Sequence, residues 1–397
     1  MNIITISTLY PNPVDHKHGI FVRTRLMHLV KHHPDIKPVV IAPVPWFFFS
    51  SSLLGKFASF SEIPAKRIDN GIEVLHPRYL VIPKLGMFLA PFTLAWALKR
   101  SLKKLILRKA SENESFKLID GHYFFPDGVA IAKAAKTVGL PFCCTARGTD
   151  INLIPENPLA KKMVLKVFEE SVYNFAVCQA LKDEMVALGA APEKTSVLRN
   201  GVDLELFTWS DNDEQKALKA ELGIKGDLVV SVGGLVERKG HHLTMEAIAN
   251  LPDTTLVIVG DGPEMQALEA LAKKLNIQDR VRLTGALRQP EVNEWFKAAD
   301  CSVLASSREG WANVLLESMA SGCPVVATDV WGTPEVVQSD QVGRLCERSV
   351  DSIREQILIL FAQETQRTAV REYAESFDWK ETSDRQCDFF ASFKKEK

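Results

Sequence analysis

Two glutamates eight residues apart, Glu309 and Glu317, flank a segment that suits the binding of an anion. An apolar run at Cys301–Ala305 predicts a buried strand, so Glu309 would lie on a strand-to-helix loop and Glu317 about one turn into the helix. The helix start, near Ala312 to Leu315, offers backbone N–H groups that favour a phosphate. Because carboxylates accept hydrogen bonds from hydroxyls, this layout matches the hexose, diphosphate and ribose of a nucleotide-sugar. From spacing alone, two ordinary helix-surface carboxylates remain an equal alternative.

A second loop with phosphate-binding chemistry follows the apolar run Leu228–Val232. It begins with Gly233 and Gly234, where the backbone can approach a ligand closely. Arg238 and Lys239 follow at the start of the next expected helix, and they offer a planar fork of donors and a point charge. A solvated Glu-Arg-Lys turn is the alternative. Two such loops at the carboxyl ends of strands in one sheet favour a ligand site, because open α/β sheets bind ligands at that edge.

The turn Gly260–Met265 partly matches the G-x-G-x-x-G fingerprint of dinucleotide-binding proteins. Pro263 stiffens it, however, and Met265 occupies the third small position. The loop at Gly233-Gly234 does not complete the fingerprint either. We therefore exclude a nicotinamide-dependent oxidoreductase.

No metal ion or resident cofactor is predicted. The acidic triplet Asp211–Asp213 mimics a D-x-D metal motif, but it falls between the two expected domains and is interpreted as a solvated turn. The pairs His16/His18 and His32/His33 have no carboxylate or thiolate at ligand spacing.

Short apolar runs without polar alternation recur along the chain, and helical patterns separate them. Such runs are typical of parallel strands that are buried on both faces. The sequence contains five in each half: Ile3–Ser7, Val39–Pro43, Leu118–Gly121, Phe142–Ala146 and Asn174–Cys178, then Leu228–Val232, Thr255–Val259, Val281–Thr284, Cys301–Ala305 and Pro324–Thr328. Two series predict two doubly wound α/β domains. The patterning lapses from Asn200 to about Gly226, which we interpret as the boundary.

Composition and cysteine usage are those of an ordinary globular protein. The 397 residues are 46% hydrophobic and 24% charged, which excludes a disordered, collagen-like or disulfide-scaffold protein. Seven cysteines without a C-x-x-C pair predict reduced thiols. The start, Asn2–Leu9, does not resemble a signal peptide, and the apolar stretch Leu85–Leu98 is shorter than the roughly 20 residues of a membrane span. These features predict a cytoplasmic protein.

The net charge of −1 averages two opposite halves: residues 1–200 hold 26 basic and 16 acidic side chains, and residues 201–397 hold 22 and 33. The near-neutral total argues against nucleic-acid binding. A basic helical stripe consists of Lys99, Arg100, Lys103, Lys104, Arg108 and Lys109, with Leu98, Leu102, Leu105 and Ile106 opposite and the apolar segments Trp46–Phe49 and Leu85–Leu98 upstream. This stripe suits an anionic membrane surface, and an ordinary helix with a solvated face is the alternative.

Taken together, the motifs resemble the family-4 retaining glycosyltransferases of GT-B fold. The resemblance covers nearly the whole chain. It rests on the glutamate pair, on GLVERKG at Gly234–Gly240, GDGP at Gly260–Pro263, VRLTG at Val281–Gly285 and RNGVD at Arg199–Asp203. It implies two Rossmann-like domains facing across a cleft, an acceptor domain at 1–200 and a donor domain at 201–379. The stretch Phe377–Trp379 resembles the point where the last helix, about 380–397, crosses back onto the first domain.

The resemblance also assigns roles to residues. Glu309 would hold the donor sugar and Glu317 the ribose diol, while Lys239 and Arg238 bind the diphosphate. The base would lie against Arg282–Leu287. The donor-binding set that the resemblance implies is Gly19, Gly233, Gly234, Leu283, Gly285, Gly310, Ala312, Asn313, Val314, Leu315 and Glu317.

Two departures from the family pattern affect the catalytic assignments. Gly234 stands where members often have an arginine, so Arg238 is the inferred substitute. Arg147 stands where many members have a histidine, and an arginine cannot act as a base. It could bind phosphate or stabilise the leaving group, and in this family the leaving phosphate is thought to serve as the base. His122 matches a recurrent family position, with a structural role equally open. The N-terminal glycine loop is reduced to His18-Gly19.

We therefore predict a metal-independent retaining glycosyltransferase that uses a UDP- or GDP-sugar. Its acceptor would be a glycan or lipid-linked molecule in surface-polysaccharide biosynthesis, met at the inner face of a membrane. A nucleotide-sugar epimerase of the same fold is one alternative. A non-catalytic nucleotide-sugar-binding partner subunit is the other, and Arg147 and Gly234 motivate it.

Overall fold

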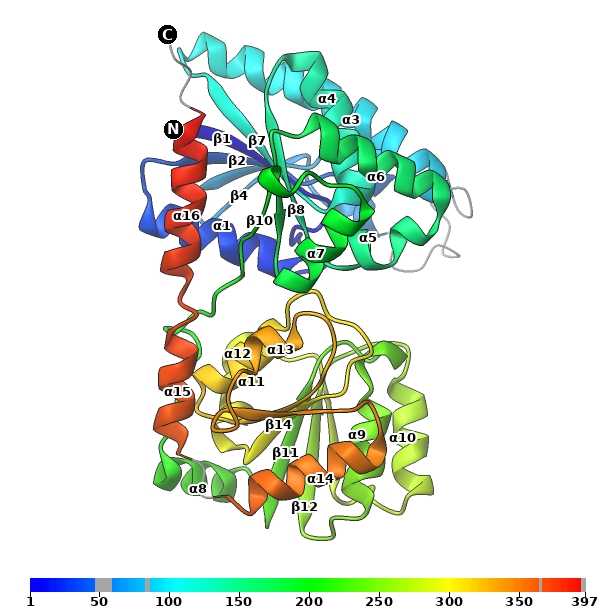
Figure 1. Ribbon diagram of the computed structural model, residues 1–397, viewed down its shortest axis with the longest axis vertical. Helices are drawn as coiled ribbons and strands as arrows, with labels where there is room; N and C mark the ends of the chain where they lie inside the picture. The colour runs from blue at the N-terminus through cyan, green and yellow to red at the C-terminus, as the bar shows by residue number, and fades with distance from the viewer. Residues whose placement is uncertain (47–58, 83–85, 364–365, 394–397) are drawn as a thin grey trace. The chain divides into compact units, whose positions relative to one another are not determined.

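The computed structural model describes residues 1–46, 59–82, 86–363 and 366–393 (Figure 1). The chain forms two compact units. The first comprises Met1–Arg199 and Lys380–Lys397, and the second comprises Asn200–Trp379. This division lies one residue from the predicted boundary.

The first unit contains an eight-stranded sheet in the order β10-β9-β8-β7-β1-β2-β5-β4. All neighbouring strands are parallel except β4 and β5, and β3 and β6 form a separate parallel pair. The strands are β1 (Asn2–Ile6), β2 (Lys37–Ile41), β3 (Val44–Trp46), β4 (Lys66–Asp69), β5 (Ile72–Leu75), β6 (Arg78–Leu80), β7 (Phe116–His122), β8 (Phe142–Ala146), β9 (Tyr173–Ala176) and β10 (Thr195–Val197). The five predicted strands of the first half are all present.

Helices cover the first sheet, and the last helix of the chain is one of them. They are α1 (Ile20–His32), α3 (Gly86–Ser111), α4 (Val129–Val138), α5 (Thr149–Asn152), α6 (Pro158–Glu170), α7 (Gln179–Leu188) and α16 (Trp379–Ser392). Phe389 and Phe390 of α16 pack into the core of this unit, and Phe389 contacts the rings of Tyr173 and Phe175. The end of the chain therefore packs with the first unit.

The second unit contains a fully parallel six-stranded sheet in the order β13-β12-β11-β14-β15-β16. The strands are β11 (Asp227–Val232), β12 (Thr254–Val259), β13 (Val281–Gly285), β14 (Cys301–Leu304), β15 (Val325–Thr328) and β16 (Gly343–Cys346). This is the Rossmann order, in which the direction of winding reverses between the first and fourth strands. Here the reversal lies between β11 and β14, and such a point is where open sheets bind ligands.

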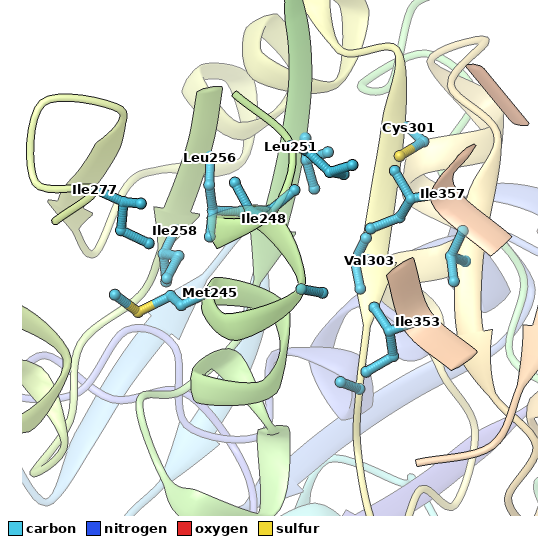
Figure 2. Close-up of a cluster of buried hydrophobic side chains, with 14 of the residues drawn as sticks. Met245, Ile248, Leu251, Leu256, Ile258, Ile277, Cys301, Val303, Ile353 and Ile357 are labelled. Carbon is cyan, nitrogen blue, oxygen red and sulfur yellow. The ribbon is translucent and has the colours of Figure 1, made fainter. Parts of the chain in front are cut away.

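The helices of the second unit connect these strands. They are α8 (Asn212–Glu221), α9 (His241–Ala249), α10 (Met265–Lys274), α11 (Gln289–Ala298), α12 (Asn313–Ala320), α13 (Thr333–Val336), α14 (Val350–Phe361) and α15 (Arg367–Glu375). Figure 2 shows how the core forms: side chains of α9 and α14 meet those of β12 and β14 in one buried apolar cluster. The alternation of apolar strand and amphipathic helix in the sequence produces this layer.

The segment between the two predicted domains is not a linker. It belongs to the second unit and contains α8, whose first turn Asp211 caps. The Asp211 side chain accepts hydrogen bonds from the N–H groups of Asp213 and Glu214, and the Glu214 carboxylate accepts one from the Asp211 N–H. The triplet predicted as a solvated turn is therefore a capping box that starts a helix.

Candidate active site

The loops after β11 and β14 are joined into one platform. Gly240 has a φ of 70°, and a Cβ there would overlap the carbonyl oxygen of Ala305 at the end of β14. The N–H of Ser307 donates to the carbonyl of Arg238 at 2.8 Å. Arg348 donates to the carbonyls of Ala305 and Glu237, at 3.1 and 3.2 Å. These contacts fix the two predicted phosphate-binding loops relative to each other.

Glu309 lies on this platform, only 9% exposed, and three polar groups converge on its Oε1. Lys239 Nζ lies 2.5 Å away, Ser306 Oγ donates at 2.6 Å, and Arg238 Nη1 lies at 3.5 Å. No described residue donates to the other oxygen, Oε2. The predicted trio of Glu309, Lys239 and Arg238 is thus brought together, with one carboxylate oxygen left to accept from a ligand hydroxyl.

The two glutamates differ in their pKa. Burial by itself would raise the pKa of Glu309, but the charge of Lys239 and hydrogen bonds from Lys239 and Ser306 hold it below its ordinary value. Among the described residues, no cation lies beside Glu317 on α12. Burial raises its pKa to about 7, and a hydrogen bond with Gln289 offsets only part of that rise. Glu309 is therefore ionised at neutral pH, whereas Glu317 is near its midpoint.

The start of α12 offers fewer free N–H groups than predicted. Asn313 donates its N–H to the carbonyl of Trp311 and Leu315 donates to that of Ala312, both at 3.0 Å. The N–H groups of Ala312 and Val314 make no hydrogen bond within the described part of the chain. Two of the four predicted donors are therefore engaged, because the first turn is tight, and two remain for an anion.

The RNGVD motif has a structural explanation next to α12. Asn200 Nδ2 donates to the side-chain oxygen of Asn313 at 3.2 Å and so holds the first residue of the helix. A Cβ at Gly201 would lie 2.7 Å from the carbonyl oxygen of Phe377 and from the nitrogen of Trp379. The sequence analysis used this motif only as a family mark. The motif positions the start of α12, and its glycine lets the backbone of Phe377 and Trp379 pass close to Gly201.

The glycine loop after β11 is shaped by the neighbouring GDGP turn. A Cβ at Gly260 would overlap the carbonyl oxygen of Gly233, and one at Gly262 would overlap that of Leu235. The stem of Lys239 lies over Gly233, whose added Cβ would be 3.4 Å from its Cδ. The glycines of GDGP thus let two backbones approach each other closely.

The segment predicted to face the base lies beside the same loops. The N–H of Gly260 donates to the carbonyl of Gly285 at the end of β13, at 2.9 Å. Gly285 has a φ of 72°, and an added Cβ would meet open space. Leu283 is half-buried on the same strand. Gln289, shortly after, hydrogen-bonds Glu317, which brings the predicted base segment and the predicted ribose carboxylate together.

In the first unit, His122 is buried and both of its ring nitrogens are engaged. Nδ1 lies 2.6 Å from Nη2 of Arg147, and Nε2 lies 3.2 Å from Oδ2 of Asp120. Because a guanidinium can only donate, Nδ1 is the acceptor and Nε2 carries the proton toward Asp120. Burial and the charge of Arg147 lower the pKa of His122 to about 4, although Asp120 opposes them. The geometry favours the structural interpretation of His122 over the catalytic one, because no nitrogen is left to accept a substrate proton.

Arg147 is held from several sides. His122 accepts from its guanidinium, the ring of Phe21 lies 5.1 Å from its Cζ, and its backbone N–H donates to Asp150 at 3.0 Å. Burial lowers its pKa to about 9, which leaves it charged at neutral pH. The Asp150 carboxylate also accepts from the N–H groups of Phe124 and Gly148. Arg147 is therefore a fixed cation at the carboxyl end of β8.

The local backbone requires a glycine at position 19. It caps α1 with a φ of 64°, and a Cβ there would overlap the backbone of Leu9. His18 contacts the carbonyl of Thr8 at 3.1 Å through Nε2. The predicted contact of Gly19 with a diphosphate stays a prediction.

Only part of the basic stripe on α3 forms ion pairs with described residues. Arg108 pairs with Glu73 at 2.7 Å, and Lys109 pairs with Glu112 at 2.7 Å and with Glu114 at 2.9 Å. Lys99, Arg100, Lys103 and Lys104 make no ion pair with any described residue, while Leu98, Leu102 and Leu105 are buried and Ile106 is half-buried. Residues 47–49 and Leu85, which were part of the predicted apolar segments, lie outside the described residues.

The described residues contain no cluster of three or more His, Cys, Asp or Glu side chains that could hold a metal ion. In the same part of the chain, no helix combines the length and the apolar character needed to cross a membrane. Each cysteine is a free thiol, and only Cys387 is partly exposed.

Sequence comparison places both units among known families. Residues 214–377 match the family described as "Glycosyl transferases group 1", and residues 57–206 match "Glycosyltransferase Family 4". TuaC of Bacillus subtilis, named as a teichuronic acid biosynthesis glycosyltransferase, is 30% identical over 367 residues, which are 90% of this chain and 88% of that protein. A Campylobacter jejuni N-acetylgalactosaminyltransferase, named for a diphospho-undecaprenol-linked acceptor, is 37% identical over 169 residues, 42% and 44% of the two chains.

Comparison of structures supports the fold. The Anabaena protein HepE, solved in complex with UDP, superposes with a TM-score of 0.71 at 20% sequence identity. The match covers 98% of this chain and 99% of that one. This chain therefore shares its fold, two largely parallel sheets each covered by helices, with a protein solved in complex with UDP.

Proposed function

Because the chain belongs to the family-4 glycosyltransferases of GT-B fold, we propose that it transfers a sugar from a UDP- or GDP-sugar, with retention of configuration, in the biosynthesis of a surface polysaccharide. One observation carries the proposal: buried Glu309 meets half-buried Lys239 at the winding reversal between β11 and β14, with Glu317 beyond the start of α12. The names of the Bacillus and Campylobacter relatives support the polysaccharide or lipid-linked acceptor.

The platform can stabilise a leaving nucleoside diphosphate. An ammonium has three donors, and Lys239 uses one on Glu309, so two are left for phosphate oxygens. Arg238 adds a second cation, and the N–H groups of Ala312 and Val314 add neutral donors. Such fixed donors lower the barrier most when negative charge develops on the leaving group in a site partly shielded from water.

Glu309 and Glu317 would hold the two ends of the donor. The free Oε2 of Glu309 accepts from a sugar hydroxyl while its Oε1 keeps Lys239 in place. Glu317 accepts from the ribose diol, next to the Leu283–Gly285 segment that would face the base. Gly233, Gly234 and Gly310 leave room for the donor between these contacts.

The proton of the acceptor would go to the leaving phosphate rather than to a side chain. His122 is the histidine for which the sequence left a catalytic role open, and neither of its nitrogens is free to take a proton. Arg147 keeps the proposed role of a cation that assists the leaving group. No metal ion is needed in this scheme, because Lys239, Arg238 and the helix start supply the positive charge.

Peripheral association with the cytoplasmic face of a membrane is also proposed. It is supported by the basic first unit and by the unpaired cations of α3. Neither an epimerase nor a non-catalytic partner subunit is favoured by any particular contact in the described residues.

A donor-binding experiment tests the proposal. Thermal unfolding is measured with UDP, GDP and a panel of their sugars, for the native protein, for Glu309→Gln and for Glu269→Gln, a control on the exposed face of α10. A selective nucleotide-sugar should raise the melting temperature of the native protein and the control but not of Glu309→Gln. No shift with any nucleotide, or the same shift in all three proteins, would contradict the proposed donor site. Anomeric analysis of the product then tests retention.

A further inference from the structure

A groove lined by lysine and apolar side chains lies in the first unit, between helices α3, α4 and α6. Its volume is about 440 Å³, which is within the range of small-molecule sites. Four lysines line it, together with five apolar side chains: Lys99, Lys133, Lys136 and Lys166, then Phe92, Val129, Ala132, Met163 and Val167.

The positive charge of this groove is largely uncompensated. Glu170 is the acidic residue that lines it, and it lies 3.6 Å from Lys166. Lys99, Lys133 and Lys136 make no ion pair with any other described residue. Lysines gathered around one hollow repel one another, so the groove favours an anionic occupant.

Exposed apolar side chains continue from the groove along α3. Phe92 is 48% exposed and Trp96 is 60% exposed, with Phe88 and Leu89 also exposed on the preceding turn. Cations accompany the rings: Lys133 Nζ lies 5.1 Å from the centre of Phe92, and the Arg100 Cζ lies 4.6 Å from that of Trp96. Neighbouring exposed aromatics among cations are typical of surfaces that enter the interface of a bilayer.

We propose that this groove and the exposed face of α3 bind the phosphate headgroups of an anionic phospholipid bilayer. The lysines would pair with phosphate, while Phe92 and Trp96 would insert beside the glycerol and upper acyl region. A soluble glycan would leave the aromatic side chains in water, whereas a bilayer removes them from water and supplies phosphate at the same depth. This inference rests on the proposed function, which supplies the membrane-bound acceptor. It involves none of the residues assigned to donor binding.

Vesicle binding of the full-length protein provides the test. Co-sedimentation is measured with vesicles of phosphatidylcholine alone and of phosphatidylcholine mixed with phosphatidylglycerol. The native protein should bind the mixed vesicles and not the neutral ones. The variant K99E/K133E/K136E should lower the partition coefficient for mixed vesicles by at least about tenfold, because each cation near an anionic surface strengthens binding several-fold.

A matched variant controls for net charge. K225E/K273E/K274E makes the same charge change at three exposed lysines of the second unit, and it should bind mixed vesicles like the native protein. Equal loss in both variants would mean that total charge, not this groove, attracts the vesicles, and would overturn the proposal.

The fluorescence of Trp96 adds a readout that a change of fold would not imitate. Mixed vesicles should shift the native emission to shorter wavelength, and Trp96→Phe should remove that shift while retaining binding. Inorganic phosphate is the parallel probe for a soluble anion. Stabilisation by phosphate that K99E/K133E/K136E abolishes, without vesicle binding, would overturn the membrane assignment.

The two proposals fail separately. Donor-induced stabilisation and transfer to a water-soluble acceptor are measured on the same variants. If the native protein binds no vesicles but still binds and transfers the donor sugar, the groove proposal is wrong and the proposed function stands. If it binds vesicles but no nucleotide-sugar, the proposed function is wrong.

Discussion

Each unit holds a buried ionic cluster at the carboxyl ends of its central strands. The two clusters differ in the hydrogen-bonding groups that remain available to a ligand. In the second unit, Glu309 keeps Oε2 free and Lys239 keeps two donors free. In the first unit, His122 spends both nitrogens on Arg147 and Asp120. Spare hydrogen-bonding capacity at a partly accessible charge is what a substrate can use, whereas a buried histidine with both nitrogens engaged serves to hold its partners in position.

The largest effect should come from Lys239→Ala. It removes the main partner of Glu309 and the strongest donor to the diphosphate, so we expect kcat/KM for transfer to fall about 10³-fold. Steady-state kinetics with the preferred donor measure this. Lys273→Ala, at an exposed position on α10, is the control and should keep the native rate. A native rate in Lys239→Ala would contradict the comparison, because the cluster around Glu309 would then contribute nothing to catalysis.

Asp120→Asn should act on stability instead. The carboxylate faces His122 and accepts from Gln386 at 3.2 Å, and its loss removes a negative charge that stabilises the buried charges of Arg25 and Arg147. We expect the first unit to lose about 3 kcal/mol of unfolding free energy, measured by urea denaturation. Nucleotide-induced stabilisation of the second unit should persist. Asp35→Asn, an exposed change, is the control, and equal stability of the two variants would show that the cluster around His122 does not stabilise the first unit.

Donor affinity should depend on pH through Glu317. Its pKa is raised to about 7, and only the ionised form can accept from both ribose hydroxyls. Affinity should therefore rise as pH increases through 7, and below the pKa it should fall by about tenfold for each pH unit. Isothermal titration of UDP or GDP between pH 6 and 8 measures this. Glu317→Gln should bind more weakly at pH 8 with a flat profile, and a profile that stays steep in this variant would assign the titration to another group.

The smallest effect should come from Arg348→Met. It cuts the two hydrogen bonds that join the platform loops while leaving all proposed ligands in the chain. We expect donor binding to weaken about threefold to tenfold, which corresponds to the loss of one or two net hydrogen bonds. The neighbouring Arg344→Met, which cuts only a surface pair with Asp340, should bind donor normally. If Arg348→Met and Arg344→Met bind the donor equally well, the platform does not depend on the two hydrogen bonds of Arg348.

Sequence predicted the central strands well because they are continuous apolar runs. The strands that it missed, such as β3, β10 and β16, have only three or four residues each, too few to establish a period. The sequence did not predict β4 for another reason. Lys66–Asp69 lies at the edge of the sheet with Ile68 exposed, so it lacks the continuous apolar pattern of a buried strand. Helix α8 was missed because most of its residues are polar, and the clearest sign of it is its cap.

The donor platform was predictable residue by residue because both loops follow strands that could be recognised. The cluster around His122 was not. It depends on β7 and β8 lying side by side with His122 opposite Thr145, and single-sequence patterns do not fix which strands are neighbours or in what register. Ser306 and Arg348 were missed for a related reason, since a serine and an arginine in loops carry no periodic signal.

The membership of α16 in the first unit bears on the order of synthesis. The first 199 residues leave the ribosome without Phe390, which fills their core, and without Gln386, which binds Asp120 and Arg25. The whole second unit, Asn200–Trp379, is made before those residues arrive, at about 5–20 residues per second. The second unit can therefore finish folding first, although it is translated later. A chain that stops at Trp379 would carry a complete donor platform on an unfinished partner.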